Sequence, residues 1–389
     1  MRIGISTSVI QRGKTGVAQY VFALVRALRA YAAEHKFFLF VLEEDVPFFK
    51  FVSGEMQLIT VPERARPPVK NIIWHQWRLP TLAREHQLDL LHVPSYRRLV
   101  WRRACGLVGT IHDLAPFHVP QKYNWTRMFY ARVIVRRLAH RQDALIAISD
   151  NTARDIVSFF KITREHITLI HNGIDHDRFF PGSSADAKVL ILKRYKIECP
   201  FFLYVARLEH PGKNHVRLIS AFEEFKAATH SDWQLVFGGS DWHGAEVIHA
   251  AIASSPFAKD IRCIGFVPDQ ELPDLYRAAN AFVYPSLYEG FGLPPVEAMA
   301  CACPVITSTR GSLGEVVGDA AAINEPEDIH SIAKQLYIVA TDEGCKARLR
   351  AAGMAQAQKY DWSRAAAMTL NLYERVASSR LARSSPASS

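Results

Sequence analysis

The sequence lacks any run of apolar residues long enough to cross a bilayer. A membrane-spanning helix needs about 20 such residues, and the strongly apolar segment 37–42 has only the length of a strand. The first residues, Met-Arg-Ile-Gly-Ile-Ser, lead directly into a strand pattern and do not show the charged, apolar and small-residue regions of a secretory signal. We therefore expect a cytoplasmic chain that does not span a membrane.

Cysteine is scarce, and its placement argues against two kinds of scaffold. The six cysteines are scattered over 389 residues, with no Cys-x-x-Cys pair and no histidine cluster beside them. This pattern disfavours both a disulfide framework and a zinc site. No Asp-x-Asp stands at the end of a predicted strand, where it could hold a divalent cation. We expect neither a metal nor another cofactor.

Negative charge is in short supply in the first half of the chain. The net charge of +9 divides into 26 Lys/Arg against 15 Asp/Glu over residues 1–178, and 21 against 23 over residues 179–389. A basic half indicates an anionic partner. The segment Trp125–Arg141 combines five arginines with aromatic residues, which fits either docking on an anionic membrane leaflet or a solvated helix. Because no signature of a nucleic-acid-binding domain is present, we expect no nucleic acid partner.

Short apolar runs alternate with amphipathic segments of helix length along the chain. The alternation predicts parallel sheets built from β-α-β units, and the length allows two such domains. The predicted fold class is α/β, with two Rossmann-like, doubly wound domains. We place them at 1–180 and 181–362, with a Pro-Gly- and Ser-rich linker at 181–185, a last helix at 363–380 and a flexible tail at 381–389.

The predicted elements follow from this periodicity. The strands are expected at 2–7, 36–42, 88–93, 106–111, 144–148, 167–170, 201–206, 234–237, 261–265, 281–284 and 305–307. The helices between them are expected at 17–33, 125–141, 216–228, 245–252 and 294–301. Ligands of doubly wound sheets bind at the carboxyl ends of the strands, so polar residues that follow a strand are the candidates for a site.

The most informative segment of the chain holds two glutamates. Glu289 and Glu297 flank a Gly-Phe-Gly turn and a Pro-Pro helix start, directly after a predicted strand. Glu297, which we place in the first helical turn, can accept from two vicinal hydroxyls such as those of a ribose. The alternative is that Glu297 complements the helix dipole and that Glu289 is a surface acid. An anion could also bind the loop amides at the positive end of the helix, namely those of Phe291, Gly292 and Leu293.

Other candidates follow the neighbouring strands. Arg207 and Lys213 come after the strand at 201–206, where they could neutralise a diphosphate or form a surface ion pair. Gly239 follows the strand at 234–237 and permits the close approach of a nucleotide. Gly16 lies between the first strand and the first helix, in a phosphate-binding loop or in a simple tight turn. His112 follows the strand at 106–111 and is either a buried histidine bonded to a carbonyl or a group that faces a ligand.

The spacing of Glu289 and Glu297 closely resembles the Glu-x7-Glu signature of glycosyltransferase family 4, and the resemblance extends over nearly the whole chain. It implies the GT-B fold, in which two Rossmann-like domains face each other across a cleft and the last helix crosses back to the first domain. The first domain would bind the acceptor and the second the nucleotide sugar. The implied reaction is a retaining, metal-independent transfer of a sugar from a nucleotide diphosphate donor to a hydroxyl.

The resemblance also implies a role for each matching residue. Glu289 would contact hydroxyls of the donor sugar, while Glu297 would hold the ribose. Arg207 and Lys213 would bind the diphosphate, and the amides of residues 291–293 the sugar and phosphate. Gly16 would lie in a loop over donor and acceptor, and His112 would lie beside the donor sugar. Gly239 would lie beside the nucleotide, and the backbone of Val267 lies in the region that contacts the base.

The donor is suggested by a segment near the end of the second domain. The run Ser312–Ala321 looks like that of bacterial polysaccharide and lipopolysaccharide mannosyltransferases, which favours GDP-mannose and a glycan or lipid-linked acceptor. UDP-glucose and UDP-GlcNAc remain open, and a catalytically silent sugar-nucleotide-binding protein is the alternative function. Since many relatives act on lipid-linked acceptors, we also expect peripheral association with the inner face of the cytoplasmic membrane.

Overall fold

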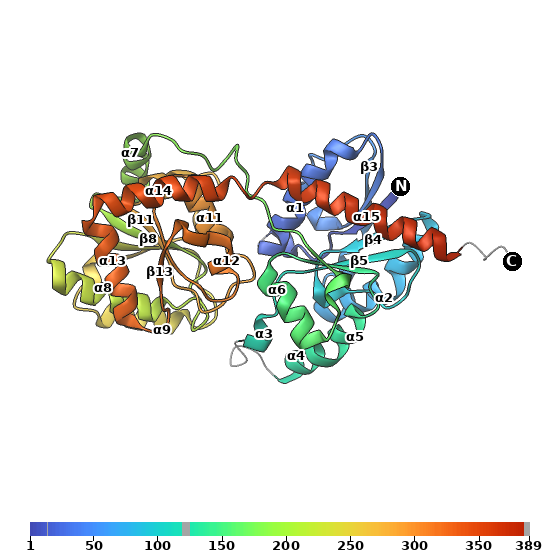
Figure 1. The fold of residues 1–389 in the computed structure, drawn as a ribbon, viewed down its shortest axis with the longest axis horizontal. Coiled ribbons are helices and arrows are strands. Elements are labelled where there is room, and N and C mark those ends of the chain that lie inside the picture. The colour runs from blue at the N-terminus through green and yellow to red at the C-terminus, as the bar shows by residue number, and fades with distance from the viewer. Residues whose placement is uncertain (14, 119–124, 385–389) are drawn as a thin grey trace. The chain divides into compact units, whose positions relative to one another are not determined.

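The structure is a computed structural model that describes residues 1–13, 15–118 and 125–384. The chain divides into two compact units, each of which is a parallel sheet flanked by helices (Figure 1). Unit 1 consists of Met1–Gly173 and Trp362–Ser389, and unit 2 of Ile174–Asp361. The predicted α/β class is confirmed in both units.

The described part of unit 1 contains a sheet of seven parallel strands in the order β3-β2-β1-β4-β5-β6-β7. The order reverses between β1 and β4, which makes this pair the topological switch point. The strands are β1 Arg2–Ser6, β2 Lys36–Leu42, β3 Met56–Val61, β4 Leu90–Val93, β5 Gly106–Ile111, β6 Ala144–Ala147 and β7 Ile167–Leu169. The helices are α1 Gly16–Leu28, α2 Pro68–Glu85, α3 Ala115–His118, α4 Trp125–Phe129, α5 Arg136–Ala139, α6 Asp150–Asp155 and α15 Trp362–Ser384.

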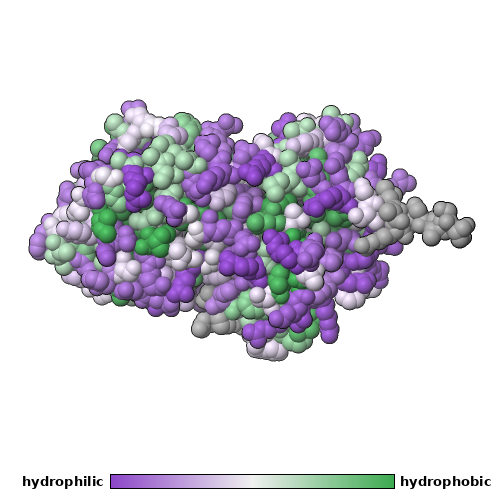
Figure 2. Space-filling view, in the orientation of Figure 1, coloured by the Kyte–Doolittle hydropathy of each residue, from purple (hydrophilic) through white to green (hydrophobic). Residues whose placement is uncertain are grey.

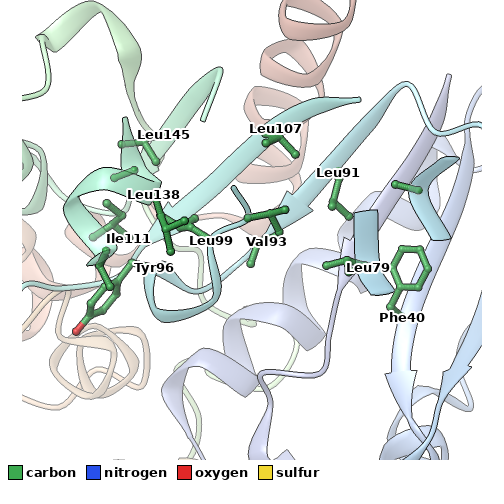
Figure 3. Close-up of a cluster of buried hydrophobic side chains, with 14 of the residues drawn as sticks. Phe40, Leu79, Leu91, Val93, Tyr96, Leu99, Leu107, Ile111, Leu138 and Leu145 are labelled. Carbon is green, nitrogen blue, oxygen red and sulfur yellow. The ribbon is translucent and has the colours of Figure 1, made fainter. Parts of the chain in front are cut away.

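Helices cover both faces of this sheet, so its strands are apolar on both sides. Every residue of β5 is buried, for example, and so is every residue of β4. Burial of each large apolar side chain contributes about 1.5 to 3 kcal/mol, and the packed core fixes the loops that leave the strand ends. Figure 3 shows this core, which brings together Phe40, Leu79, Leu91, Val93, Tyr96, Leu99, Leu107, Ile111, Leu138 and Leu145.

Unit 2 has a sheet of six parallel strands in the order β10-β9-β8-β11-β12-β13. Its switch point lies between β8 and β11. The strands are β8 Phe201–Val205, β9 Gln234–Gly238, β10 Ile261–Gly265, β11 Ala281–Tyr284, β12 Val305–Ser308 and β13 Ala322–Asn324. The helices are α7 Ser184–Tyr195, α8 His215–Thr229, α9 Ala245–Ser254, α10 Leu272–Ala278, α11 Leu293–Ala300, α12 Leu313–Val317, α13 Ile329–Thr341 and α14 Glu343–Ala357.

The boundaries between the units differ from the predicted ones. Unit 1 ends at Gly173 rather than at residue 180, because Ile174 pairs with Asp361 of unit 2. The predicted linker at 181–185 is partly helical, since α7 begins at Ser184 with the side chain of Ser183 as its N-cap. The predicted tail begins too early, because α15 continues to Ser384; residues 385–389 lie outside the described part.

The last helix, α15, packs against α1, β4 and β5 of unit 1. Its Tyr373 hydroxyl lies 2.6 Å from Nδ1 of His92 in β4, and Nε2 of His92 lies 2.8 Å from the Thr110 hydroxyl in β5. The Thr110 hydroxyl in turn lies 3.2 Å from the hydroxyl of Tyr20 in α1. This chain of buried hydrogen bonds, which we call the Tyr373–Tyr20 chain, joins α15 to β4, β5 and α1 of unit 1.

Candidate functional site

Two loops of unit 2 leave the sheet at its topological switch point. The strands β8 and β11 are neighbours, and residues 206–213 and 285–292 follow their carboxyl ends. Ligands of doubly wound sheets bind at such positions. The first loop carries Lys213 and the second carries Glu289, so the topology brings both predicted residues together.

Lys213 and Glu289 form an ion pair in which only one carboxylate oxygen takes part. Nζ of Lys213 lies 2.5 Å from Oε1 of Glu289. The same oxygen accepts hydrogen bonds from the Ser286 hydroxyl at 2.6 Å and the Tyr284 hydroxyl at 3.1 Å. The other oxygen, Oε2, has no hydrogen-bond partner among the described residues and is not sealed from solvent. It can therefore accept from a ligand hydroxyl.

The surroundings of Lys213 keep its side chain charged. Burial lowers the pKa of Lys213, but the Glu289 carboxylate, together with Tyr204 and Glu209, raises it above the usual value overall. Lys213 is therefore a cation at neutral pH. A fixed positive charge next to an available carboxylate oxygen suits a ligand that carries both phosphate and hydroxyl groups.

The backbone of Glu289 is held by the segment that follows β12. Ser312 donates to the Glu289 carbonyl oxygen through its amide and through its hydroxyl, each at 3.0 Å. Gly311 has a φ of +64°, and a Cβ at this position would lie 2.4 Å from the same oxygen. Only glycine fits there without displacing Glu289. These contacts fix the backbone of Glu289, from which its side chain presents the available oxygen Oε2.

The predicted helix start after Glu289 is present, with one correction. Gly292 has a φ of +94° and precedes α11, and Phe291 is buried against Tyr360 with ring centroids 5.4 Å apart. Leu293 is the first helical residue, so Glu297 is the fifth and lies in the second turn, not in the first as predicted. The helix dipole acts mainly within the first turn, so it does not account for a glutamate at this position.

Glu297 is a carboxyl group in an apolar environment. Burial raises the pKa of Glu297 to about 7, although Arg178 and the hydrogen bond from Tyr276 oppose the shift. The Tyr276 hydroxyl donates to Oε2 at 3.2 Å. In the described residues, Oε1 has no partner and is not sealed from solvent, so one acceptor atom is again available.

The remaining predicted residues of unit 2 stand in varied environments. Arg207 is exposed, its guanidinium lies 4.7 Å from the centre of the Trp242 ring, and it forms no ion pair within the described residues. Gly239 has a φ of +149°, and a Cβ there would lie 1.9 Å from the Ala206 carbonyl oxygen. The close approach of these two loops is therefore enough to require glycine, whether or not a nucleotide binds there. Val267 is buried.

Gly16 and His112 belong to unit 1. Gly16 is the first residue of α1, which the Thr15 side chain caps by accepting from the amide of Ala18. His112 follows β5 and is buried, with Nε2 3.0 Å from the Pro94 carbonyl oxygen. Because a carbonyl cannot donate, Nε2 carries the proton. Burial lowers the pKa of His112, so the ring is neutral at pH 7 and Nδ1 is an acceptor.

Both interpretations of His112 thus have support, because it is a buried histidine bonded to a carbonyl that still offers one acceptor atom.

The residues that hold Glu289 in place were not predicted from the sequence. Tyr284 and Ser286 lie within the same motif and could have been found from their spacing before Glu289. Ser312 could not, because its contact with Glu289 depends on the pairing of β11 with β12.

In the ranges that the structure describes, no group of three or more His, Cys, Asp or Glu side chains could hold a metal ion. Metal independence stays a prediction, because it is a property of the reaction. No helix in these ranges is long and apolar enough to cross a membrane.

Comparisons with known proteins match both halves of the chain. A family profile described as Glycosyltransferase Family 4 matches residues 14–178, and one described as Glycosyl transferases group 1 matches residues 193–357. The chain belongs to these glycosyltransferases. The family predicted from Glu289 and Glu297 is therefore confirmed, and with it the prediction of a transferase enzyme.

The glycosyltransferase is 28% identical to O-antigen chain mannosyltransferase B of Escherichia coli, over 96% of this chain and 100% of that protein. Sucrose-phosphate synthase from Thermosynechococcus elongatus has a similar structure, with a TM-score of 0.79 and 21% identity over 97% of this chain and 100% of that chain. HepE from Anabaena, in complex with UDP and glucose, reaches a TM-score of 0.75 at 18% identity, covering 96% and 100%. These likenesses confirm the predicted GT-B fold.

Proposed function

We propose that this glycosyltransferase moves a mannosyl group from GDP-mannose to a hydroxyl of a glycan or lipid-linked acceptor in the synthesis of a cell-surface polysaccharide. The observation that carries the proposal is the Lys213–Glu289 pair at the switch point of unit 2, with Oε2 of Glu289 available. The likeness to O-antigen chain mannosyltransferase B supports mannose as the sugar. UDP-glucose and UDP-GlcNAc are the alternative donors.

Lys213 and Glu289 would bind different parts of the donor. Oε2 of Glu289 accepts hydrogen bonds from hydroxyls of the sugar, while Lys213 stabilises the charge of the departing diphosphate, with Arg207 as a second cation. Oε1 accepts from three donors, which lowers the nucleophilicity of the carboxylate. Glu289 is therefore a positioning group and not the nucleophile of a double displacement.

Retention without a nucleophile requires substitution on one face of the sugar. The bond between the anomeric carbon and the diphosphate oxygen breaks while the bond to the acceptor oxygen forms on the same face. The departing diphosphate oxygen takes the proton of the acceptor hydroxyl, so the products are the glycoside and the nucleoside diphosphate. Positioned cations supply the stabilisation that this charge separation needs, without a metal.

Glu297 and His112 would bind the two ends of the donor. A carboxylate at Glu297 accepts from the ribose hydroxyls through Oε1, and this acceptor becomes fully charged only above its pKa of about 7. Nδ1 of the neutral His112 accepts from a sugar hydroxyl. Both interactions recognise hydroxyl donors, which a nucleotide sugar offers at both ends.

The proposal is tested by release of nucleoside diphosphate from a panel of GDP-, UDP- and dTDP-sugars, each with and without EDTA. We expect slow release from GDP-mannose that EDTA does not change. Glu289→Gln and Lys213→Gln should slow it by about 10² or more, since each removes one preorganised contact, and Glu198→Gln, at an exposed position, should not.

Other results of this assay would each change a specific part of the proposal. Release from a UDP-sugar alone would replace mannose with another donor. Loss of release in EDTA, restored by a divalent cation, would refute metal independence. Binding of a donor without any release would support the silent sugar-nucleotide-binding protein. Stereochemistry follows from the anomeric NMR signals of the product, and inversion would contradict the proposed mechanism.

We also propose that unit 1 associates with an anionic membrane surface on the cytoplasmic side. Trp125 and Phe129 of α4 are 78% and 56% exposed, and both hydrophilic and hydrophobic residues lie at the lower edge of the view in Figure 2, where Figure 1 draws α4. Exposed aromatic side chains beside arginines favour binding to an anionic leaflet. Arg136 is exposed and keeps its charge although its Nε donates to the Phe160 carbonyl oxygen, and the side chain of Arg127 lies outside the described residues.

The association is measured by sedimentation with vesicles of phosphatidylglycerol and phosphatidylcholine. Binding should rise with the phosphatidylglycerol fraction and fall in high salt, and a Trp125→Ser, Phe129→Ser variant should bind more weakly. Absence of binding to either kind of vesicle would favour the solvated-helix alternative, and equal binding to neutral vesicles would contradict a role for the arginines.

A further inference from the structure

The loop after β9, residues 239–244, carries a tryptophan to which the proposed function gives no role. This loop leaves the carboxyl edge of the sheet of unit 2, one strand away from the switch point, because β9 is the neighbour of β8. The side chain of Trp242 is 55% exposed, and the guanidinium of Arg207 lies over its ring, 4.7 Å from the ring centre. An exposed aromatic side chain thus contacts one of the two cations of the candidate site.

Backbone hydrogen bonds align this loop with the loop after β8. The amide of Leu208 donates to the Ser240 carbonyl oxygen at 3.0 Å, and the amide of Trp242 donates to the Leu208 carbonyl oxygen at 3.0 Å. Arg207 directly precedes Leu208 in the chain. The pairing of the two loops therefore fixes the backbone of Arg207 relative to the backbone of Trp242.

The close approach of the two loops depends on glycine at both ends of the loop after β9. A Cβ at Gly239 would lie 1.9 Å from the Ala206 carbonyl oxygen. Gly244 has a φ of +80°, and a Cβ there would lie 2.9 Å from the Cβ of His210. Side chains at these two positions would push the loops apart. The backbone therefore holds the tryptophan and the arginine within reach of each other.

The contact with the ring leaves the charge of Arg207 available. A cation over an aromatic ring is attracted by the quadrupole of the ring, which carries no net charge. Among the described residues, Arg207 forms no ion pair and no side-chain hydrogen bond, and it is exposed. Its N–H groups can therefore donate to a phosphate, which a guanidinium binds through two parallel hydrogen bonds.

The two cations of the site are held in different ways. Lys213 is held by a carboxylate, because its Nζ lies 2.5 Å from Oε1 of Glu289. A carboxylate orients a cation, but it also offsets the charge and competes with a phosphate for the donors. The ring of Trp242 orients Arg207 without competing in this way. Arg207 is thus a cation with a defined position and an uncompensated charge.

We propose that Trp242 is a positioning residue, which holds the guanidinium of Arg207 in place for the diphosphate of the donor. The inference rests on the proposed function, which assigns the diphosphate to Arg207. Without the ring, the long side chain of Arg207 samples many rotamers, and a ligand that binds it must offset the lost side-chain entropy. The ring reduces this loss in advance, so Trp242 acts on binding and on rate only through Arg207.

A double-mutant cycle tests whether Trp242 acts through Arg207. GDP, UDP and inorganic pyrophosphate are each titrated calorimetrically into wild type, Trp242→Ala, Arg207→Gln and the double variant. The contribution of an exposed cation–π contact corresponds to a change of about fivefold in affinity. We expect Trp242→Ala to weaken each ligand that the wild type binds by about this factor, and to have no further effect when Arg207 is already replaced by glutamine.

Conservative substitutions separate the π system of the ring from its bulk. Trp242→Phe keeps an aromatic face and should recover most of the affinity, whereas Trp242→Leu keeps an apolar side chain without a π system and should behave like Trp242→Ala. The matched control is Trp77→Ala in unit 1. Trp77 is 58% exposed and has Arg102 over its ring at 3.9 Å, so it loses the same kind of contact and should change no affinity.

The rate of nucleoside diphosphate release provides a second measurement. Negative charge on the diphosphate grows as it departs, so a positioned cation stabilises the transition state more than the bound donor. Trp242→Ala should therefore lower kcat more than it raises KM, and Trp242→Phe should restore kcat. A tryptophan that only fills the surface would show neither this division between kcat and KM nor the rescue by phenylalanine.

The outcomes separate this inference from the proposed function. Unchanged affinity in Trp242→Ala, or an equal loss with and without Arg207, would overturn the inference even if donor turnover is normal. A loss for the nucleotides but not for bound pyrophosphate would also overturn it, because the ring would then contact the base. Conversely, coupling between Trp242 and Arg207 in a protein that turns over no donor would support the inference and refute the proposed transfer. A wild type that binds none of the three ligands would refute both.

Discussion

At the scale of single residues, Glu297 is a candidate site residue whose environment opposes its charge. Its pKa is about 7 in the folded protein, against 4.5 as the ordinary value, so the folded state holds the proton more tightly than the unfolded state. Ionisation therefore destabilises the fold as the pH rises from 4.5 to 7, and the effect is complete above pH 7. We expect Glu297→Gln to stabilise the protein by up to about 3 kcal/mol at pH 8 and by little at pH 4.

Thermal unfolding of wild type and Glu297→Gln over this pH range measures the effect. Glu198→Gln, at an exposed position of unit 2, serves as the control and should track the wild type at every pH. The stabilised variant should bind the nucleoside diphosphate more weakly at pH 8, because the charged acceptor for the ribose is gone. A variant that is less stable than wild type at pH 8 would show that other groups compensate the carboxylate.

The sequence alone predicted the two residues of the ion pair in unit 2, but not the residues that hold Glu289 in place. Lys213 and Glu289 follow predicted strands in recognisable motifs. Gly311 and Ser312 follow another strand, and their contacts with the Glu289 carbonyl oxygen appear only in the structure. A sequence does not reveal these contacts, because they depend on the pairing of β11 with β12.

At the scale of elements, the loop after β12 fixes the loop after β11 through Gly311. Gly311→Ala should lower the melting temperature and slow donor turnover together, because it adds strain at a positive φ and a clash with the Glu289 carbonyl oxygen. Gly54 is the matched control, since it has a φ of +67° with open space around the position of a Cβ. Gly54→Ala should cost only the strain, about 1 to 2 kcal/mol, and leave turnover unchanged.

Melting curves and rates of nucleoside diphosphate release measure both variants. Equal losses of stability without a difference in rate would mean that the contact of Gly311 with Glu289 has no influence on the site.

Most strands were predictable because buried parallel strands are continuous apolar runs. β2 matches its predicted bounds, and β5 and β11 do as well. β3 was missed because it is partly exposed and mixes polar with apolar residues. α2 was missed because it contains Pro80 and exposes Trp77 and Ile73, so its apolar stripe is not visible in the sequence.

At the scale of the whole molecule, the Tyr373–Tyr20 chain attaches the last helix to unit 1. Tyr373→Phe removes the partner of Nδ1 of His92, which remains buried, and should destabilise unit 1 by about 1 to 3 kcal/mol. Tyr337→Phe, at a side chain that is 48% exposed, should have little effect. The stabilisation of unit 2 by nucleoside diphosphate should be the same in both variants.

Differential scanning calorimetry distinguishes these effects. If unit 1 and unit 2 melt separately, only the transition that nucleoside diphosphate does not shift should move in Tyr373→Phe. A shift of the ligand-sensitive transition instead would show that α15 supports unit 2.

The division of the chain has a consequence for biosynthesis. Unit 2 is one continuous stretch, Ile174–Asp361, whereas unit 1 needs both Met1–Gly173 and α15. Domains generally fold as units while the ribosome extends the chain, the N-terminal domain first. Here we expect the order to be reversed, because the N-terminal sheet waits for α15, which is synthesised after the whole of unit 2. The unit that is started first is finished last, and its β4–β5 surface is uncovered throughout the synthesis of unit 2.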